Sequence, residues 1–135
     1  MIYKLHNLKK MQLDQELVAK QALVAQGFDC DNKIQELQQE LNTTGVKAFG
    51  SIGDFKVLAI HKDSIKFEQN QIKKQKRLIE QKIQVHNQKI VELNKELEQY
   101  KYLIEVDKKE KRKQEEKNEE LAASEFVQAR WGANL

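Results

Sequence analysis

The most regular stretch of this chain is residues 55–107, which read FKVLAIHKDSIKFEQNQIKKQKRLIEQKIQVHNQKIVELNKELEQYKYLIEVD. Two sets of positions recur within it at alternating spacings of three and four residues. One set is Phe55, Lys62, Gln69, Lys76, Ile83, Ile90, Leu97 and Ile104, and the other is Leu58, Ile65, Ile72, Ile79, His86, Leu93, Tyr100 and Asp107. This is the heptad pattern of a left-handed coiled coil, held over seven repeats. The sequence therefore predicts a long helix that packs against another helix along this seam.

The chemistry of the seam changes along its length. Between residues 62 and 76 one core position holds Lys62, Gln69 and Lys76, whereas between 79 and 104 both positions are apolar except at His86. We therefore expect loose packing in the first half and tight packing in the second. A polar residue in a seam most often fixes the register of the helices, so His86 is interpreted in this way rather than as a ligand or a pH switch.

A shorter partner helix is predicted over residues 2–42. Its apolar and small residues also recur at helical spacing, at Leu13, Leu17, Val24, Gly27, Cys30, Ile34, Leu37 and Leu41. Gly27 introduces either a kink or a close helix approach, or is simply a tolerated substitution.

The break between the two helices is predicted at residues 43–51. Pro is absent from the chain, and three of its five Gly lie between positions 45 and 53. Gly45 suits a helix C-cap and Ser51 a helix start. The second helix is predicted over 52–128 and a frayed tail over 129–135. The fold class is thus an all-α, two-helix antiparallel coiled-coil hairpin that forms a single domain over residues 1–135, with the second helix longer.

The unequal helix lengths predict an unpaired part of the seam. At about 1.5 Å per residue the helices span roughly 60 Å and roughly 110 Å, so the first helix is expected to end opposite about residue 93. That leaves Leu97, Tyr100 and Ile104 without an intramolecular partner. An exposed apolar stripe of this kind marks a protein interaction surface.

Composition restricts the class of protein further. Hydrophobic residues make up 39% of the chain and charged residues 33%, which is too little apolar material for a round core but enough for helical stripes. The net charge is +3 and both signs are interleaved, which is typical of solvated helix faces rather than of a nucleic-acid interface. One cysteine, no signal-peptide pattern and no long apolar run predict a soluble cytoplasmic protein.

No residue pattern indicates catalysis. The chain has no Gly-rich phosphate loop, no nucleophile motif and no Cys or His cluster at metal-binding spacing, so we expect no catalytic residue, cofactor, metal or small-molecule substrate. The basic stretch KKQKR at residues 73–77 suits nucleic acid, anionic lipid or an acidic protein surface. Because no aromatic residues are interleaved with it, the protein surface is favoured.

Several segments together resemble a known family. They are IYKLHNLKKMQ at the N-terminus, the Gly-containing bend, GDFKVLAIHKDSI at the start of the second helix and the charged KKEKRKQEEKNEELAASEF near its end. This arrangement is similar to FliJ, the flagellar type III export protein, and to the YscO-like stalk proteins of injectisomes. The tail EFVQARWGANL is more aromatic than that family's pattern, so Phe126 and Trp131 receive no role.

The resemblance implies a non-enzymatic stalk. Proteins of this family place the ends of both helices in the pore of a hexameric export ATPase, point the bend at the export-gate membrane protein, and in some cases bind export chaperones. It implies a cytoplasmic protein peripherally associated with the inner-membrane export apparatus. The implied ATPase-ring residues are Lys4, Leu8, Leu97, Tyr100, Ile104, Lys111, Arg112, Gln114 and Lys117. The implied gate residues are Phe55, Leu58, Ile65 and Phe67.

Two other functions fit the residues. One is a structural coiled coil that self-associates through the Ile-rich seam of residues 79–104. The other is a nucleic-acid or membrane-surface binder that uses residues 62–90, where eight Lys or Arg face three Asp or Glu.

Overall fold

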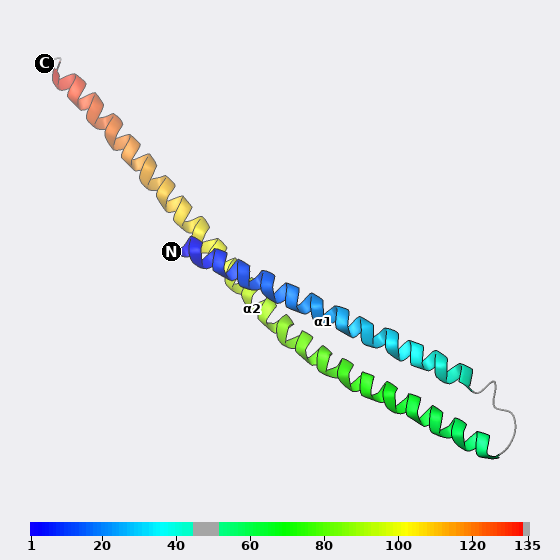
Figure 1. Cartoon of the computed structure of the whole chain (residues 1–135). Helices are drawn as coiled ribbons and strands as arrows, with labels where there is room; N and C mark the ends of the chain where they lie inside the picture. The colour runs from blue at the N-terminus through cyan, green and yellow to red at the C-terminus, as the bar shows by residue number, and fades with distance from the viewer. Residues whose placement is uncertain (45–51, 134–135) are drawn as a thin grey trace. The chain divides into compact units, whose positions relative to one another are not determined.

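The computed structural model of the protein describes residues 1–44 and 52–133, and both described stretches are helical (Figure 1). Helix α1 runs over Ile2–Thr44 and helix α2 over Ile52–Ala133. The described residues contain no strand. The prediction of an all-α protein with two helices, the second longer, is confirmed.

The chain divides into two compact units, each built from parts of both helices. Unit 1 comprises Met1–Gln12 and Leu93–Leu135, and unit 2 comprises Leu13–Glu92.

The inward face of α2 follows the predicted heptad. Every seam position from Leu58 to Asp107 is buried or half-buried, and the residues between them are mostly exposed. Phe55 is the exception, because its side chain is exposed. A residue in a two-helix seam is covered from one side only, which explains why so few side chains are fully enclosed. The buried residues are Cys30, Ile65, Gln69 and Leu93.

The inward face of α1 differs from the prediction in its first half. One set of covered positions alternates by four and three residues along the whole helix: Ile2, His6, Lys9, Leu13, Glu16, Lys20, Leu23, Gly27, Cys30, Ile34, Leu37, Leu41 and Thr44. Three residues next to this set, Gln12, Ala19 and Asp31, are half-buried as well. Leu17 and Val24 were expected in the seam but are exposed. They lie one position after Glu16 and Leu23, which take the inward places. Because Glu16 and Lys20 are charged, the apolar pattern of the sequence alone points to the wrong register here.

Contacts in unit 2 establish that the helices run antiparallel. Asp31 contacts Lys76 (Oδ1 to Nζ, 2.6 Å), and further along α1 Glu40 lies against the earlier α2 residue His61 (Oε1 to Nε2, 3.7 Å). Figure 1 shows this part of α1 and of α2 side by side.

Gln69 fixes the register of this pairing. Its side chain is 6% exposed, and its amide nitrogen donates one hydrogen bond to the carbonyl oxygen of Ile34 (3.3 Å) and one to Oε1 of Gln38 (3.2 Å). Both N–H groups of the amide are therefore satisfied. Sliding the helices by one turn would bury these donors without acceptors, which costs about 1–3 kcal/mol for a buried polar group.

The register differs from the expected one. Glu40 pairs with His61, so α1 ends beside the third turn of α2 rather than beside its first residue. The exposed residues 54–57 precede the paired part of α2. Each α1 residue consequently meets a residue further along α2 than helix lengths alone predict.

Unit 1 shows the same shift in register between α1 and α2. Lys9 contacts Glu96 (Nζ to Oε2, 2.7 Å), and Leu97, Tyr100 and Ile104 are half-buried. The prediction that α1 ends opposite about residue 93 and leaves these three side chains unpaired is wrong.

The helix ends also extend beyond their predicted bounds. Thr43 and Thr44 belong to α1, and each hydroxyl donates a hydrogen bond to the carbonyl oxygen of Glu40. Helix α2 continues to Ala133, so residues 129–133 are helical instead of frayed. The predicted cap residues Gly45 and Ser51, with the rest of the bend, lie outside the described residues.

Gly27 is not required by the packing of the helices. A Cβ atom at this position would lie 3.8 Å from Cγ2 of Ile79, an ordinary van der Waals distance, and α1 continues through Gly27.

We predict that Gly27→Ala raises the free energy of unfolding by about 1 kcal/mol, because Ala restricts the unfolded backbone and favours the helix. Urea denaturation followed by circular dichroism at 222 nm measures this. Gly132→Ala, in the last turn of α2, is the control and should change the free energy of unfolding much less. An equal change in both variants would contradict the prediction.

Candidate functional site

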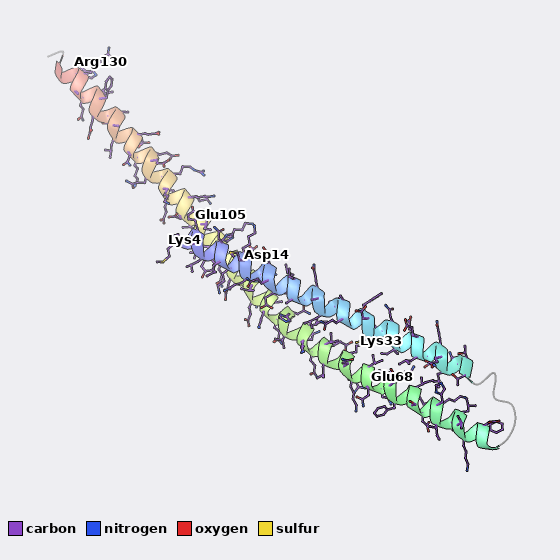
Figure 2. The ribbon with its side chains drawn as sticks, viewed as in Figure 1. Lys4, Asp14, Lys33, Glu68, Glu105 and Arg130 are labelled. Carbon is purple, nitrogen blue, oxygen red and sulfur yellow. The ribbon has the colours of Figure 1, made fainter. Side chains whose placement is uncertain are left out.

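The C-terminal part of α2 is the largest surface that the fold leaves uncovered. In unit 1, residues 1–12 of α1 accompany α2 from Leu93 to about Asp107. Beyond that point every residue from Lys108 to Gly132 is exposed. Figure 2 shows side chains on both sides of the ribbon near Arg130. We call residues 108–132 the bare segment.

Charge is unevenly distributed along the bare segment. Residues 108–113, KKEKRK, contain five basic residues and one acidic residue, a net charge of +4. Residues 115–120, EEKNEE, contain four acidic residues and one basic residue, a net charge of −3. Lys111 contacts Asp107 (Nζ to Oδ2, 3.2 Å), and this is the one ion pair that the described residues beyond Glu105 contain.

The nine predicted ATPase-ring residues all lie in unit 1 but are not equally accessible. Lys4 and Leu8 on α1 are exposed, as are the four residues of the bare segment: Lys111, Arg112, Gln114 and Lys117. Gln114 donates a hydrogen bond to Oδ1 of Asn118 at 3.3 Å. The remaining three, Leu97, Tyr100 and Ile104, are half-buried.

Sequence reasoning missed an apolar pair on the outer side of α2 in unit 1. Tyr102 is 67% exposed, and the neighbouring Leu103 is exposed as well. With Glu98 and Gln99 they line an open depression on the helix surface. Phe126, Val127 and Trp131, at the end of the bare segment, are also exposed. The sequence pattern could have identified all of these exposed residues, since each is a large apolar residue at a position outside the heptad seam.

The four predicted gate residues lie in unit 2 and divide between surface and core. Phe55 and Phe67 are exposed, Leu58 is half-buried and Ile65 is 4% exposed. Ile65 therefore packs in the seam and is not available to a partner, because it faces α1 whereas Phe67, two residues on, faces away from it. Val57 and Ile60 were missed and are both exposed. The apolar surface of this part of α2 consists of Phe55, Val57, Ile60 and Phe67, which we call the bend-proximal patch.

Ion pairs between the helices carry the clearest pKa effects. A hydrogen bond to Asp31 raises the pKa of Lys76, and a hydrogen bond to Glu96 raises the pKa of Lys9. In the bare segment a hydrogen bond to Asp107 raises the pKa of Lys111. His86 is half-buried in the seam, where its Nδ1 contacts Oε2 of Glu16. The predicted register role of His86 is consistent with this cross-helix contact.

The described residues contain no cluster with the ligands for a metal ion. Within residues 1–44 and 52–133, no three His, Cys, Asp or Glu side chains gather into a set able to hold a metal ion. The expectation that the chain is not an enzyme stays a prediction. No helix in the described part of the chain has the length and apolarity needed to cross a membrane.

Comparisons with known proteins add no relative. No protein-family model, no curated protein and no solved structure matches this chain.

The contrast between Ile65 and Phe67 is testable. We predict that Ile65→Ala lowers the free energy of unfolding by about 2–4 kcal/mol, because it removes buried methylene groups from the seam. Phe67→Ala is the matched control and should change it by less than about 0.5 kcal/mol, since the ring is 66% exposed. Urea denaturation of both variants measures the difference. If Phe67→Ala lowers the free energy of unfolding as much as Ile65→Ala does, the outer face of α2 is packed and not free.

A second prediction concerns pH. Because its folded-state pKa lies above the ordinary value of 10.5, Lys76 stabilises the fold below pH 10.5 and loses this contribution as the pH rises through the raised value. The wild-type protein should therefore have a higher urea midpoint than Lys76→Gln at pH 8, and the difference should shrink as the pH rises above 10.5. Lys74→Gln, an exposed neighbour, should show no such pH-dependent difference. If the difference in urea midpoint between the wild type and Lys76→Gln persists at high pH, the stabilising effect of Lys76 comes from the packing of its side chain and not from its charge.

Proposed function

We propose that this protein is a non-enzymatic stalk component of a bacterial type III protein export apparatus. In this proposal the bare segment enters the pore of the hexameric export ATPase and the bend-proximal patch contacts the export-gate membrane protein. The chain acts in the cytoplasm, peripherally associated with the inner-membrane apparatus. It couples ATP hydrolysis to secretion, with export chaperones as further partners.

The observation that carries the proposal is the exposure of the bare segment on every face. A partner that packs on one side of a helix needs one apolar stripe, whereas a ring pore surrounds the helix and contacts all of its faces. Residues 108–132 are exposed all round and are mostly charged up to Glu120. An isolated helix of this composition is marginal in water, so an enclosing partner would stabilise it.

The charges of the bare segment suit a pore lined by acidic side chains near its basic half. Lys111, Arg112 and Lys117 are exposed, and Arg forms bidentate hydrogen bonds with carboxylates. The first turns of α1 add Lys4 and Leu8 to the same unit. Leu97, Tyr100 and Ile104 take a different role from the expected one, since they hold α1 on α2 just before the bare segment begins.

The bend-proximal patch supports a second contact. Phe55, Val57, Ile60 and Phe67 expose large apolar side chains within about four turns of α2, and surfaces of this kind are commonly covered by protein partners. This is the part of the molecule that the family resemblance assigns to the gate.

The mechanism requires no chemistry from the chain itself. A stalk influences nucleotide turnover when it binds one conformation of the ring subunits more tightly than another. A single helix lacks the symmetry of a ring, so the bare segment presents different side chains to different subunits and thereby biases which subunit closes on its nucleotide.

Self-association through the seam of residues 79–104 was the alternative. These seam positions are buried or half-buried within their own units, so a second copy would need another surface of the chain.

The proposal is tested with the export ATPase of the same organism. We expect the wild-type chain to stimulate its turnover, and the triple variant Lys111→Glu, Arg112→Glu, Lys117→Glu to bind the ring about tenfold or more weakly, because reversed charges at an interface repel. The control is the triple variant Lys73→Glu, Lys74→Glu, Arg77→Glu, which changes the same charge at exposed positions of unit 2. Binding and ATPase rate are measured by anisotropy and phosphate release. If the first variant binds the ring as tightly as the wild type does, the proposal is wrong.

A further inference from the structure

The bare segment and the turns before it carry a stripe that is complementary to itself. At alternating spacings of three and four residues, one side of α2 presents Gln99, Tyr102, Val106, Lys109, Lys113, Glu116, Glu120, Ala123, Val127 and Arg130. The order along the stripe is apolar, basic, acidic, apolar, with a polar residue at each end. We call these ten residues the outer stripe.

The outer stripe lies on the side of α2 that α1 does not cover. The positions that face α1 are three or four residues apart from one another, such as Ile104 and Asp107, and the outer stripe occupies the heptad positions roughly opposite them. All its members are exposed except Val106, which is half-buried. Nine of the ten stripe residues are therefore accessible to a second copy.

A second copy of the chain in antiparallel orientation matches this stripe residue for residue. In an antiparallel coiled coil, facing residues have a constant sum of residue numbers, and here that sum is 229. It places Lys109 opposite Glu120 and Lys113 opposite Glu116. It also places Tyr102 opposite Val127 and Val106 opposite Ala123, with Gln99 opposite Arg130 at each end. Every pair occurs twice, because a two-fold axis passes between Gln114 and Glu115.

A parallel pair is excluded by the same charges. In register it would place Lys109 against Lys109 and Glu116 against Glu116, and like charges across a helix interface repel. Only the antiparallel arrangement satisfies the basic and acidic halves together.

The single helix also carries repulsion that this pairing relieves. Five pairs of like charge are spaced i,i+4 within residues 108–120: 108 with 112, 109 with 113, 113 with 117, 115 with 119 and 116 with 120. Like charges at this spacing destabilise an isolated helix. Opposite charges from a second copy compensate those pairs that lie on the outer stripe. Lys111, on the other side of the helix, is already paired with Asp107.

We propose that the protein forms an antiparallel homodimer through the outer stripe of α2. The centre of the interface is a set of symmetric ion pairs, and its two ends are apolar contacts of Tyr102 with Val127 of the second copy. The proposal does not depend on the export function. If both are correct, the dimer and the ATPase ring compete for the bare segment, because a paired helix cannot enter a ring pore that encloses it.

Charge reversal in two halves tests the proposal. The variant Lys109→Glu, Lys113→Glu makes the centre of the stripe wholly acidic, and Glu116→Lys, Glu120→Lys makes it wholly basic. Each variant alone should dimerise about 100-fold or more weakly than the wild type, since every central pair becomes repulsive. Mixed one to one, the two variants should form a heterodimer, because each central pair is again of opposite charge. A variant that merely unfolds is not rescued by mixing.

The measurement is sedimentation equilibrium of the full chain at 50 mM and 500 mM NaCl. We expect dimerisation of the wild type to weaken at the higher salt concentration, where exposed ion pairs are screened. The control variant Lys108→Glu, Lys111→Glu reverses the same charge on the other side of α2 and should dimerise like the wild type. A wild type that stays monomeric at low salt, or two variants that fail to associate on mixing while both remain helical, would overturn the proposal.

Spin labelling checks the orientation. With Cys30 replaced by Ala and a label at Lys101→Cys, an exposed position outside the outer stripe, the two labels of an antiparallel dimer are 27 residues of helix apart, which is about 40 Å. A parallel pair in register would bring them within about 20 Å. The longer distance in pulsed dipolar spectroscopy supports the proposal, and the shorter one contradicts it.

Discussion

The antiparallel seam between α1 and α2 is the constraint on which the other features of this protein depend. It is a narrow contact, with three buried apolar residues, Cys30, Ile65 and Leu93, and a row of half-buried ones. Such a seam gains little from area alone, so its register depends on polar contacts that only one alignment satisfies. Gln69, with both amide donors bound to α1, and the cross-helix pairs of Lys76 and His86 provide that specificity.

The register determines which surfaces remain for partners. Because α1 pairs with α2 further along than helix lengths suggest, Leu97, Tyr100 and Ile104 are covered and the first turns of α2 are not. The seam position Phe55 is exposed as a result. The surfaces that remain uncovered include the bend-proximal patch and α2 beyond Asp107.

A helix without an intramolecular partner is only marginally stable in water. The bare segment carries many charges in an order that is far from random, basic and then acidic. This order suits a partner of opposite polarity on each half, whether that partner is a ring of subunits or a second copy of the chain. Competition between the two partners would let the concentration of the protein influence how much of it is available to an ATPase.

The sequence by itself determined the helical class, the seam of α2 from Leu58 onward and the location of the break between helices, because these depend on local periodicity and on Gly content. The alternation of charge along the bare segment is likewise a property of the sequence. Tertiary structure decided the rest. Glu16 and Lys20, rather than Leu17, face α2, and Ile65 is buried while Phe67 is free. The physical reason is that register and exposure are set by contacts between residues distant in sequence, such as Gln69 with Ile34, and no local pattern encodes which turn of α2 those contacts select.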